Sequence, residues 1–410
     1  MQSAQSRRIA ANPNGHCEKP STSATCFHRI GVNAANEMHT SAESLRIAAE
    51  QLSAATLIPA AAHRMVCFKE FLMRRLLLPL LALICPICPL RHVTHSAVAD
   101  EPLKIHGKTM GSYYAIVIDS PGTTDAKQLQ DEIEARFADI NRQMSTWDEA
   151  SEISQFNRSE STDWFAVGND FAVVIQEAKR LHVLTEGTLD CTVAPLIDAW
   201  GFGVRKRKTI PSDAEIAVAL KDVGMQHLEV RLEPPSIRKT IPGLQLSLSS
   251  IAPGYATDQV CAILRSHGLK SHVVDVGGEN RAGDAKANGD GWRVGVESPL
   301  GGRLHKVVEL TDKAITTSGD YRNFFITDGK KYSHILDPKT GRPVENPSAC
   351  VSVIHRSCMT ADGLDTAMMV LGSERGIALA RRCEVDVMFL DVNSAGELVE
   401  TSIGVFSDPE

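Results

Sequence analysis

Aromatic side chains and positive charge are both scarce in this 410-residue chain. Phe, Trp and Tyr make up 5% of the residues, and 43 Lys and Arg are outnumbered by 50 Asp and Glu, which gives a formal net charge of −7. Proteins that bind duplex nucleic acid normally present a basic face, and those that bind single strands stack bases on aromatic rings. The composition therefore argues against nucleic-acid binding. Hydrophobic residues, at 43%, match a folded globular protein.

The motifs of common nucleotide and zinc sites are also missing. The chain has no G-x-x-x-x-G-K-[ST] and no G-x-G-x-x-G, so neither a P-loop nor a Rossmann dinucleotide site is predicted. The cysteines after residue 100 are scattered and include no C-x-x-C, which argues against a zinc site or a disulfide framework. They are Cys191, Cys261, Cys350, Cys358 and Cys383. We expect them to be small buried hydrophobic residues.

The first hundred residues differ in kind from the rest. Residues 1–99 carry a net charge of +5, whereas residues 100–410 carry −12. Residues 1–64 show no sustained apolar period, and we expect residues 1–72 to be disordered or to precede the true start of the protein. Residues 73–99 have the anatomy of a secretory signal peptide, so 100–410 is the expected mature domain.

Three features define this signal peptide: the basic Met73-Arg74-Arg75, the fifteen apolar residues Leu76–Leu90, and the cleavage pattern Ala97-Val98-Ala99. The apolar run is shorter than the roughly 20 residues of a membrane-spanning helix, and its prolines disfavour the alternative of a core helix. Cys85 follows a poor lipidation motif, so a lipid anchor is weakly supported. We expect an exported protein, periplasmic or on the outer side of the inner membrane.

Helical and strand patterns mix along residues 100–410, which predicts one compact α+β unit. A small helix and a hairpin are expected between Pro211 and Pro242. The longer helices are predicted at Ala126–Met144, Asn169–Thr185 and Gly254–His267, and the strands at Ser271–Val276, Trp292–Val296, Val307–Leu310, Ala349–Ile354 and Asp386–Leu390.

Two carboxylates and a hydroxyl form the first candidate site. A helix beginning near Asp362 places Asp362, Asp365 and Thr366 on one face of its first turn. This hard oxygen cluster suits Mg²⁺. The alternative is that the acidic residues only complement the positive end of the helix. Spacing alone leaves both open.

Turns and polar runs supply the other candidates. Ser249–Tyr255 predicts a turn that opens a helix and directs N–H groups outward, either an anion site or an ordinary turn. Val276-Gly277-Gly278 predicts a strand that enters a tight turn. The polar run Thr316–Asn323 needs partners if it is buried. His334, which follows Ser333, is either a general base or a structural histidine.

Taken together, these segments resemble the ApbE family of FAD:protein FMN transferases over about residues 104–395. The resemblance rests on Met110–Ser112, Met144–Trp147, Ser154–Asn157, Gly187–Leu196, Trp200–Gly203, Ser249–Tyr255, Gly277–Glu279, Trp292-Arg293, Ser318–Asn323, Tyr332–Pro338 and Met359–Thr366. It implies mixed sheets with flanking helices, and Mg²⁺-dependent transfer of FMN from FAD to a Thr or Ser hydroxyl of an exported or membrane redox protein, with release of AMP.

The resemblance also implies roles for single residues. His334 would be the base, and the flavin nucleotide would contact Met110, Trp147, Thr188, Leu189, Asp190 and Ile315. Mg²⁺ would be held by Asp362, Asp365, Thr366 and the carbonyl of Ser250. At two expected nucleotide contacts the chain departs from the family, with Ser247 for the usual Asp and Pro253 for the usual Lys. The alternatives are a flavoprotein that binds FAD without transferring FMN, and an FAD pyrophosphatase.

Overall fold

The computed structural model describes residues 101–204, 210–321, 323–345 and 348–407. The expected extension at 1–72 and signal peptide at 73–99 lie outside these residues. Within the described ranges, no helix is both long and apolar enough to cross a membrane.

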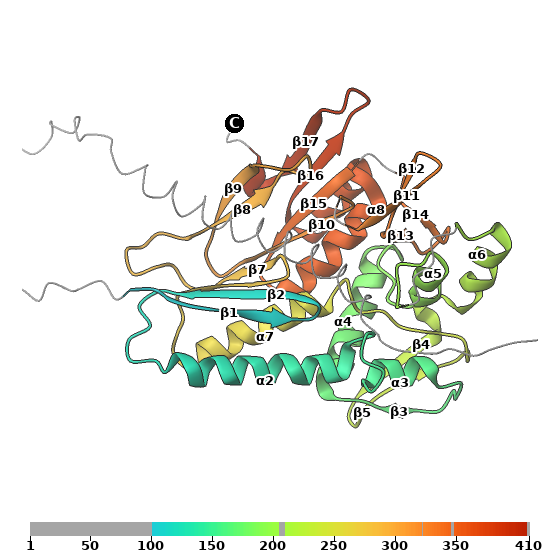
Figure 1. Ribbon diagram of the computed structural model, residues 1–410, viewed down its shortest axis with the longest axis horizontal. Helices are drawn as coiled ribbons and strands as arrows, with labels where there is room; N and C mark the ends of the chain where they lie inside the picture. Colours follow the sequence, from blue (N-terminus) through green and yellow to red (C-terminus); the bar gives the residue numbers. More distant parts are fainter. Residues whose placement is uncertain (1–100, 205–209, 322, 346–347, 408–410) are drawn as a thin grey trace, which may run out of the picture. The chain divides into compact units, whose positions relative to one another are not determined.

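An eight-stranded sheet organises the described part of the chain, and each strand in it runs antiparallel to its neighbours (Figure 1). Neighbouring strands often come from distant segments, since β2 pairs with β6 and β7 with β10. The order across the sheet is β1 (Leu103–Thr109), β2 (Ser112–Ile118), β6 (His272–Val276), β7 (Glu279–Ala282), β10 (Ala314–Gly319), β15 (Ser348–His355), β16 (Asp386–Val392) and β17 (Leu398–Ile403).

Smaller sheets surround this main sheet. A hairpin and a small helix lie between Pro211 and Pro242, as predicted. The other predicted strands also form, four of them with slightly wider bounds and β6 one residue shorter than the predicted Ser271–Val276. The small sheets are β3 (Phe165–Ala166) with β5 (Pro235–Lys239) and β4 (Leu228–Leu232), β8 (Trp292–Glu297) with β9 (Leu304–Leu310), β11 (Phe324–Thr327) with β12 (Lys330–Ser333), and β13 (Leu336–Asp337) with β14 (Arg342–Pro343).

The predicted helices form because their apolar residues recur at helical spacing and their ends are capped. Asp125 accepts hydrogen bonds from two N–H groups of α2, and Ser212 and Glu215 form a capping box on α6. The helices are α2 (Ala126–Met144), α3 (Glu152–Arg158), α4 (Asn169–Leu184), α5 (Ala194–Ala199), α6 (Asp213–Ala219), α7 (Ala252–Ser266) and α8 (Cys358–Cys383), with short 3₁₀ turns at Leu220–Asp222, Met225–His227 and Gly404–Phe406.

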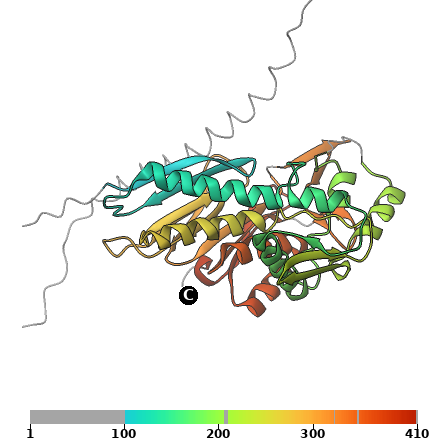
Figure 2. The same cartoon turned by 90° about the horizontal axis from the view of Figure 1, so that it is seen from below.

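Helices cover one face of the main sheet, and the β8–β9 hairpin packs on the other. α7 and α8 lie on strands β6, β7, β10 and β15, and α2 runs beside α7 in both views (Figures 1 and 2). α8 is interrupted at Gly372, whose φ of 74° and ψ of 172° are not helical. The fold is therefore the expected single α+β unit.

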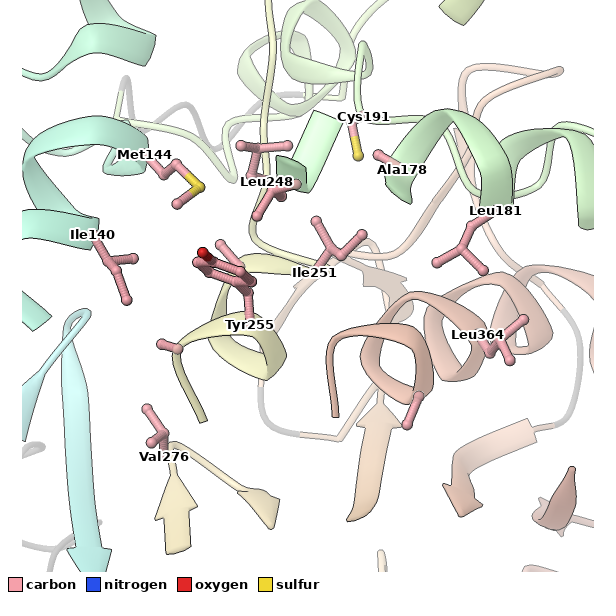
Figure 3. Packing of buried hydrophobic residues seen from close by; sticks show 14 of the residues in the cluster. Ile140, Met144, Ala178, Leu181, Cys191, Leu248, Ile251, Tyr255, Val276 and Leu364 are labelled. Carbon is pink, nitrogen blue, oxygen red and sulfur yellow. The ribbon is translucent and has the colours of Figure 1, made fainter. Parts of the chain in front are cut away.

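The start of α7 lies at the centre of the main core (Figure 3). Tyr255 and Ile251 are packed among Met144 of α2, Leu181 of α4 and Leu364 of α8. The Tyr255 hydroxyl also donates to Asp170 at 2.6 Å. This packing fixes the turn before α7 against the first half of α8, where the predicted metal ligands lie.

Candidate functional site

Helix α8 begins a full turn earlier than the sequence predicted. It starts at Cys358 rather than near Asp362, because Ser357 caps it and Asp258 of α7 accepts hydrogen bonds from the N–H groups of Cys358 (2.9 Å) and Met359 (3.2 Å). The prediction that Asp362 lies in the first turn is therefore wrong. Since the first turn contains no acidic residue, the structure also disfavours the alternative that Asp362 only complements the helix end.

Asp362 is buried between α8 and the turn that opens α7. Its Oδ2 accepts a hydrogen bond from the N–H of Gly254 at 2.8 Å, and its side chain is 4% exposed. A Cβ on Gly254 would lie 2.5 Å from the carbonyl oxygen of Cys358, so only glycine permits this approach. Burial, followed by the negative charges of Glu279 and Asp365, raises the pKa of Asp362 well above its usual range.

Asp365 lies one turn further along α8, facing the end of β10. The Ser318 hydroxyl donates to its Oδ1 at 2.8 Å and lies 3.0 Å from the Thr366 hydroxyl. Burial raises the pKa of Asp365 to about 7, although hydroxyls that include those of Ser318 and Thr366 oppose the rise. Ser318 was not among the predicted ligands, but it belongs to the polar run Thr316–Asn323 that the sequence singled out as needing partners.

No positive charge among the described residues compensates the Asp362 and Asp365 carboxylates. In the described ranges neither carboxylate is paired with Lys, Arg or His. Burial without such a partner favours the protonated form of both side chains over the ionised form. No group of three or more His, Cys, Asp or Glu suited to a metal occurs there either. A cation at this place would need further oxygen ligands from hydroxyls and carbonyls. The donor set of Asp362, Asp365 and Thr366 fits a hard divalent cation such as Mg²⁺.

The predicted carbonyl ligand, Ser250, directly precedes the N-cap residue of α7, Ile251. A regular helix would direct the Gly254 N–H at this carbonyl, but that N–H donates to Asp362 instead. Ser250 also lies close enough to hydrogen-bond the buried thiol of Cys191. The turn thus brings Ser250 and Asp362 into one neighbourhood, as the metal prediction requires.

The two departures from the family lie on the same segment. The Ser247 N–H donates to the carbonyl of Cys191 at 2.8 Å, and its hydroxyl is 3.2 Å from that of Ser249. The Asn157 side-chain amide donates a hydrogen bond to the carbonyl of Leu246 and accepts one from its N–H. Pro253 occupies the first turn of α7, where a missing N–H costs no helical hydrogen bond. The backbone of the turn is therefore well fixed without the Asp and Lys side chains.

Thr188, Leu189 and Asp190 lie in the loop after α4. All three are buried: the Thr188 hydroxyl donates to the carbonyl of Thr185 at 2.9 Å, and Asp190 Oδ1 accepts from the N–H of Thr192 at 2.7 Å. Asp190 borders an open cavity of about 490 Å³ together with His182, Val183, Glu186, Gly187, Val223, Gly224, Gln226, Pro338 and Lys339. Among the described residues of this loop, Asp190 is therefore a predicted contact that borders an open cavity.

The other predicted flavin contacts are dispersed. Met110 occupies the β1–β2 turn with a positive φ of 51°, and Trp147 is 64% exposed in the loop after α2. Ile315 is 2% exposed in the core between the main sheet and the β8–β9 hairpin. Its side chain points to the opposite face of β10 from Ser318, so its position lends the predicted role no support.

His334 follows β12 at the base of the β11–β12 hairpin. Its N–H donates to the carbonyl of Asn323 at 3.2 Å, and its ring lies edge-on to Phe202, with centroids 6.3 Å apart. Burial lowers the pKa of His334, while the Asn323 carbonyl and the charge of Asp320 oppose the fall. The ring is therefore neutral near pH 7, the state in which it can accept a proton.

Comparison with known proteins identifies the family. The model of the ApbE family matches residues 110–389. The FAD:protein FMN transferase of Vibrio cholerae is 43% identical over 294 residues, which is 71% of this chain and 87% of the relative. That of Escherichia coli K12 is 32% identical over 289 residues, 69% of this chain and 82% of the relative.

Solved structures agree with these relatives. The flavin transferase ApbE from Vibrio cholerae matches with a TM-score of 0.69 and 40% identity, covering 75% of this chain and 98% of that one. The apo flavinyl transferase ApbE from Pseudomonas stutzeri matches with a TM-score of 0.69 and 36% identity, covering 75% and 96%. The fold is that of the flavin transferases. The chain belongs to the ApbE family.

Proposed function

We propose that this chain is an FAD:protein FMN transferase that uses Mg²⁺ to move FMN from FAD to a Thr or Ser hydroxyl of an acceptor protein, releasing AMP. Family membership supports the flavin transfer. The single structural observation that carries the metal dependence is the pair of buried carboxylates, which have no cationic partner among the described residues. A divalent cation would compensate both charges at once.

Asp362, Asp365 and Thr366, with the Ser250 carbonyl, would hold the cation beside the diphosphate. When bound, Mg²⁺ neutralises phosphate charge and orients the phosphoryl group for in-line attack. Ser318 donates to Asp365, which orients that carboxylate. Met110, Trp147, Thr188, Leu189, Asp190 and Ile315 remain the proposed nucleotide contacts, and Asp190 borders the cavity.

His334 would accept the proton of the acceptor hydroxyl. As this proton moves to the imidazole, the acceptor oxygen forms a bond to the phosphorus of the FMN half. The bond between that phosphorus and the bridging oxygen of the diphosphate breaks, and AMP leaves. Burial keeps His334 neutral, so it is ready to take the proton at neutral pH.

The experiment mixes purified protein with FAD, Mg²⁺ and an acceptor domain that carries a flavinylation Thr or Ser. The expected result is a covalent gain of FMN mass on the acceptor with an equal amount of AMP, lost when EDTA is added or when His334→Ala replaces the wild type. Tight FAD binding without transfer would indicate a flavin-binding protein instead. Free FMN and AMP formed without acceptor would indicate a pyrophosphatase.

We also propose that the protein acts outside the cytoplasm, in the periplasm or on the outer side of the inner membrane. The support is the signal-peptide anatomy of residues 73–99. Its acceptor would then be an exported or membrane redox protein.

A further inference from the structure

The segment that leads into the turn before α7 is arranged like a strand. Leu244, Leu246 and Leu248 are at most 1% exposed, and the residues between them are only partly buried, which is the alternation of a strand with one face in the core. Within the described ranges the segment belongs to none of the sheets, and an isolated parallel bridge joins its Gln245 to Val193. Its buried main-chain groups therefore need other partners.

At Leu246 the side chain of Asn157 takes the place of a neighbouring strand. Asn157 lies near the end of α3, 89 residues earlier in the chain. Its Oδ1 accepts a hydrogen bond from the N–H of Leu246 at 2.7 Å, and its Nδ2 donates to the carbonyl of the same residue at 2.9 Å. An antiparallel partner residue would exchange the same two bonds. Asn157 ends the motif Ser154–Asn157, to which the sequence assigned no role.

Lys239 of β5 makes a second link between the same two segments. Its ammonium is fully buried and donates to the carbonyls of Leu244 at 3.0 Å and Phe156 at 3.2 Å. It also lies 4.9 Å from the centre of the Phe156 ring. Burying an ammonium is costly unless its donors are satisfied, so Lys239 indicates a fixed link between the two main chains. Asn157 and Lys239 together are called the clamp below.

The turn that follows the clamped segment is held at both ends. Four residues beyond Leu246, Ser250 offers the carbonyl that is proposed to bind the cation. At the far end of the turn, the N–H of Gly254 donates to Asp362 of α8 at 2.8 Å. The clamp thus fixes one end of the turn to α3 and β5, and α8 fixes the other.

We propose that Asn157 and Lys239 are positioning residues for the cation: they hold the segment before the turn so that the Ser250 carbonyl lies beside the carboxylates of Asp362 and Asp365. The inference rests on the proposed function for the cation itself. A main-chain ligand has no rotamer of its own, so its place is set by the chain on either side of it. Groups that orient a metal ligand without touching the metal contribute to metal affinity in this way.

The first test measures the Kd for Mg²⁺ alone by isothermal titration calorimetry, in the wild-type protein and in Asn157→Ala. We expect the Kd to rise about 10- to 100-fold in the variant. In assays of FMN transfer, the KM for Mg²⁺ should rise in the same way, whereas saturating Mg²⁺ should restore most of kcat. An unchanged Kd would overturn the proposal.

Two lysines separate positioning from general stability. Lys239→Met removes the second half of the clamp and should weaken Mg²⁺ binding as Asn157→Ala does. Lys179 of α4 also joins two main-chain carbonyls, those of Met225 at 3.1 Å and of Leu228, but neither belongs to the segment that enters the turn. Lys179→Met should therefore lower stability in urea and leave the Kd for Mg²⁺ unchanged. Equal weakening of Mg²⁺ binding in Lys179→Met and in the clamp variants would contradict the proposal. If Lys239→Met does not fold, Asn157→Ala alone is compared with this control.

Hydrogen exchange of main-chain amides, followed by NMR without metal, tests the clamp independently of the cation. The N–H of Leu246 should exchange faster in Asn157→Ala because its acceptor has been removed. If the clamp positions the turn, exchange should also quicken at Gly254, whose N–H donates to Asp362. Unchanged exchange at Gly254 would refute the positioning role. If the wild type binds no Mg²⁺ and transfers no FMN, the proposed function fails, but exchange at Gly254 still decides whether the clamp holds the turn.

Discussion

Asp365 should destabilise the metal-free protein at neutral pH, so that Asp365→Asn makes that form more stable. The carboxyl is 2% exposed and burial raises its pKa to about 7, whereas an unfolded Asp titrates near 3.9. The folded chain therefore binds this proton more tightly than the unfolded chain does. The free energy of unfolding falls as pH rises between about 4 and 7, by about 4 kcal/mol in all for this group.

Asn cannot ionise, yet it can still accept the hydrogen bond from Ser318. In EDTA at pH 8 we expect Asp365→Asn to be more stable than the wild type by up to about 4 kcal/mol, and at pH 4 to be equal to it. The free energy of unfolding of the variant should still fall somewhat as pH rises, because the pKa of Asp362 is raised as well. Mg²⁺ at 100 times its Kd should stabilise the wild type by about 2.7 kcal/mol. It should have little effect on the variant, which should also lose FMN transfer.

Urea unfolding followed by circular dichroism, between pH 4 and 8 with EDTA or Mg²⁺, measures these differences. Asp170→Asn is the matched control. Burial tends to raise the pKa of Asp170, but hydrogen bonds from Arg136 and Tyr255 outweigh it and lower the pKa overall. That substitution should destabilise the protein by about 3–5 kcal/mol, because it breaks the mostly buried Arg136–Asp170 ion pair and leaves Arg136 only its more exposed partner Asp139. The reasoning is refuted if Asp365→Asn in EDTA is no more stable than the wild type at pH 8 while the control behaves as expected.

Three further outcomes are expected. Ser247→Asp with Pro253→Lys should tighten FAD binding about tenfold or more at fixed Mg²⁺, measured by fluorescence quenching, and equal or weaker binding in a folded variant would mean that other residues already serve those phosphates. Asp258→Ala should lower the free energy of unfolding in urea by about 3–5 kcal/mol, because it uncaps α8 and leaves the half-buried Arg281 unpaired. A loss below about 1 kcal/mol would contradict the capping role. N-terminal sequencing of exported protein should begin near Asp100, and a mature chain that keeps residues 1–72 would disprove the signal-peptide prediction.

Local patterns in the sequence predicted helices α2, α4 and α7 and five of the strands, but not β1, β2, β10 or β17 of the main sheet. α2 was predicted to the residue, because Leu129, Ile133, Phe137 and Ile140 recur at helical spacing and Asp125 caps the helix. The β6–β7 turn was readable because Gly277 and Gly278 both take positive φ. These signals lie within a few residues of the structure that they specify.

The start of α8 could not be read in the same way. Its N-terminal N–H groups are satisfied by Asp258, about a hundred residues earlier in the chain. Without that partner, Asp362 was the nearest acidic residue and looked like the helix start. The order of strands in the main sheet could not be predicted either, because it depends on contacts between distant segments. β2, for example, pairs with β6 across more than 150 residues.

At the candidate metal centre, the sequence identifies the residues, but only the structure distinguishes a metal site from a helix cap. The sequence identified Asp362, Asp365 and Thr366 by type and spacing, but it could not separate a metal site from a helix cap. The structure makes that separation by comparison with other Asp side chains. Asp170 is paired with Arg136, and Asp258 with Arg281. Asp362 and Asp365 are more deeply buried, and their donors in the described part of the chain are hydroxyl and N–H groups. Two buried carboxylates side by side are costly unless something positive joins them. This missing charge is why a cation, rather than the helix end, best accounts for the pair.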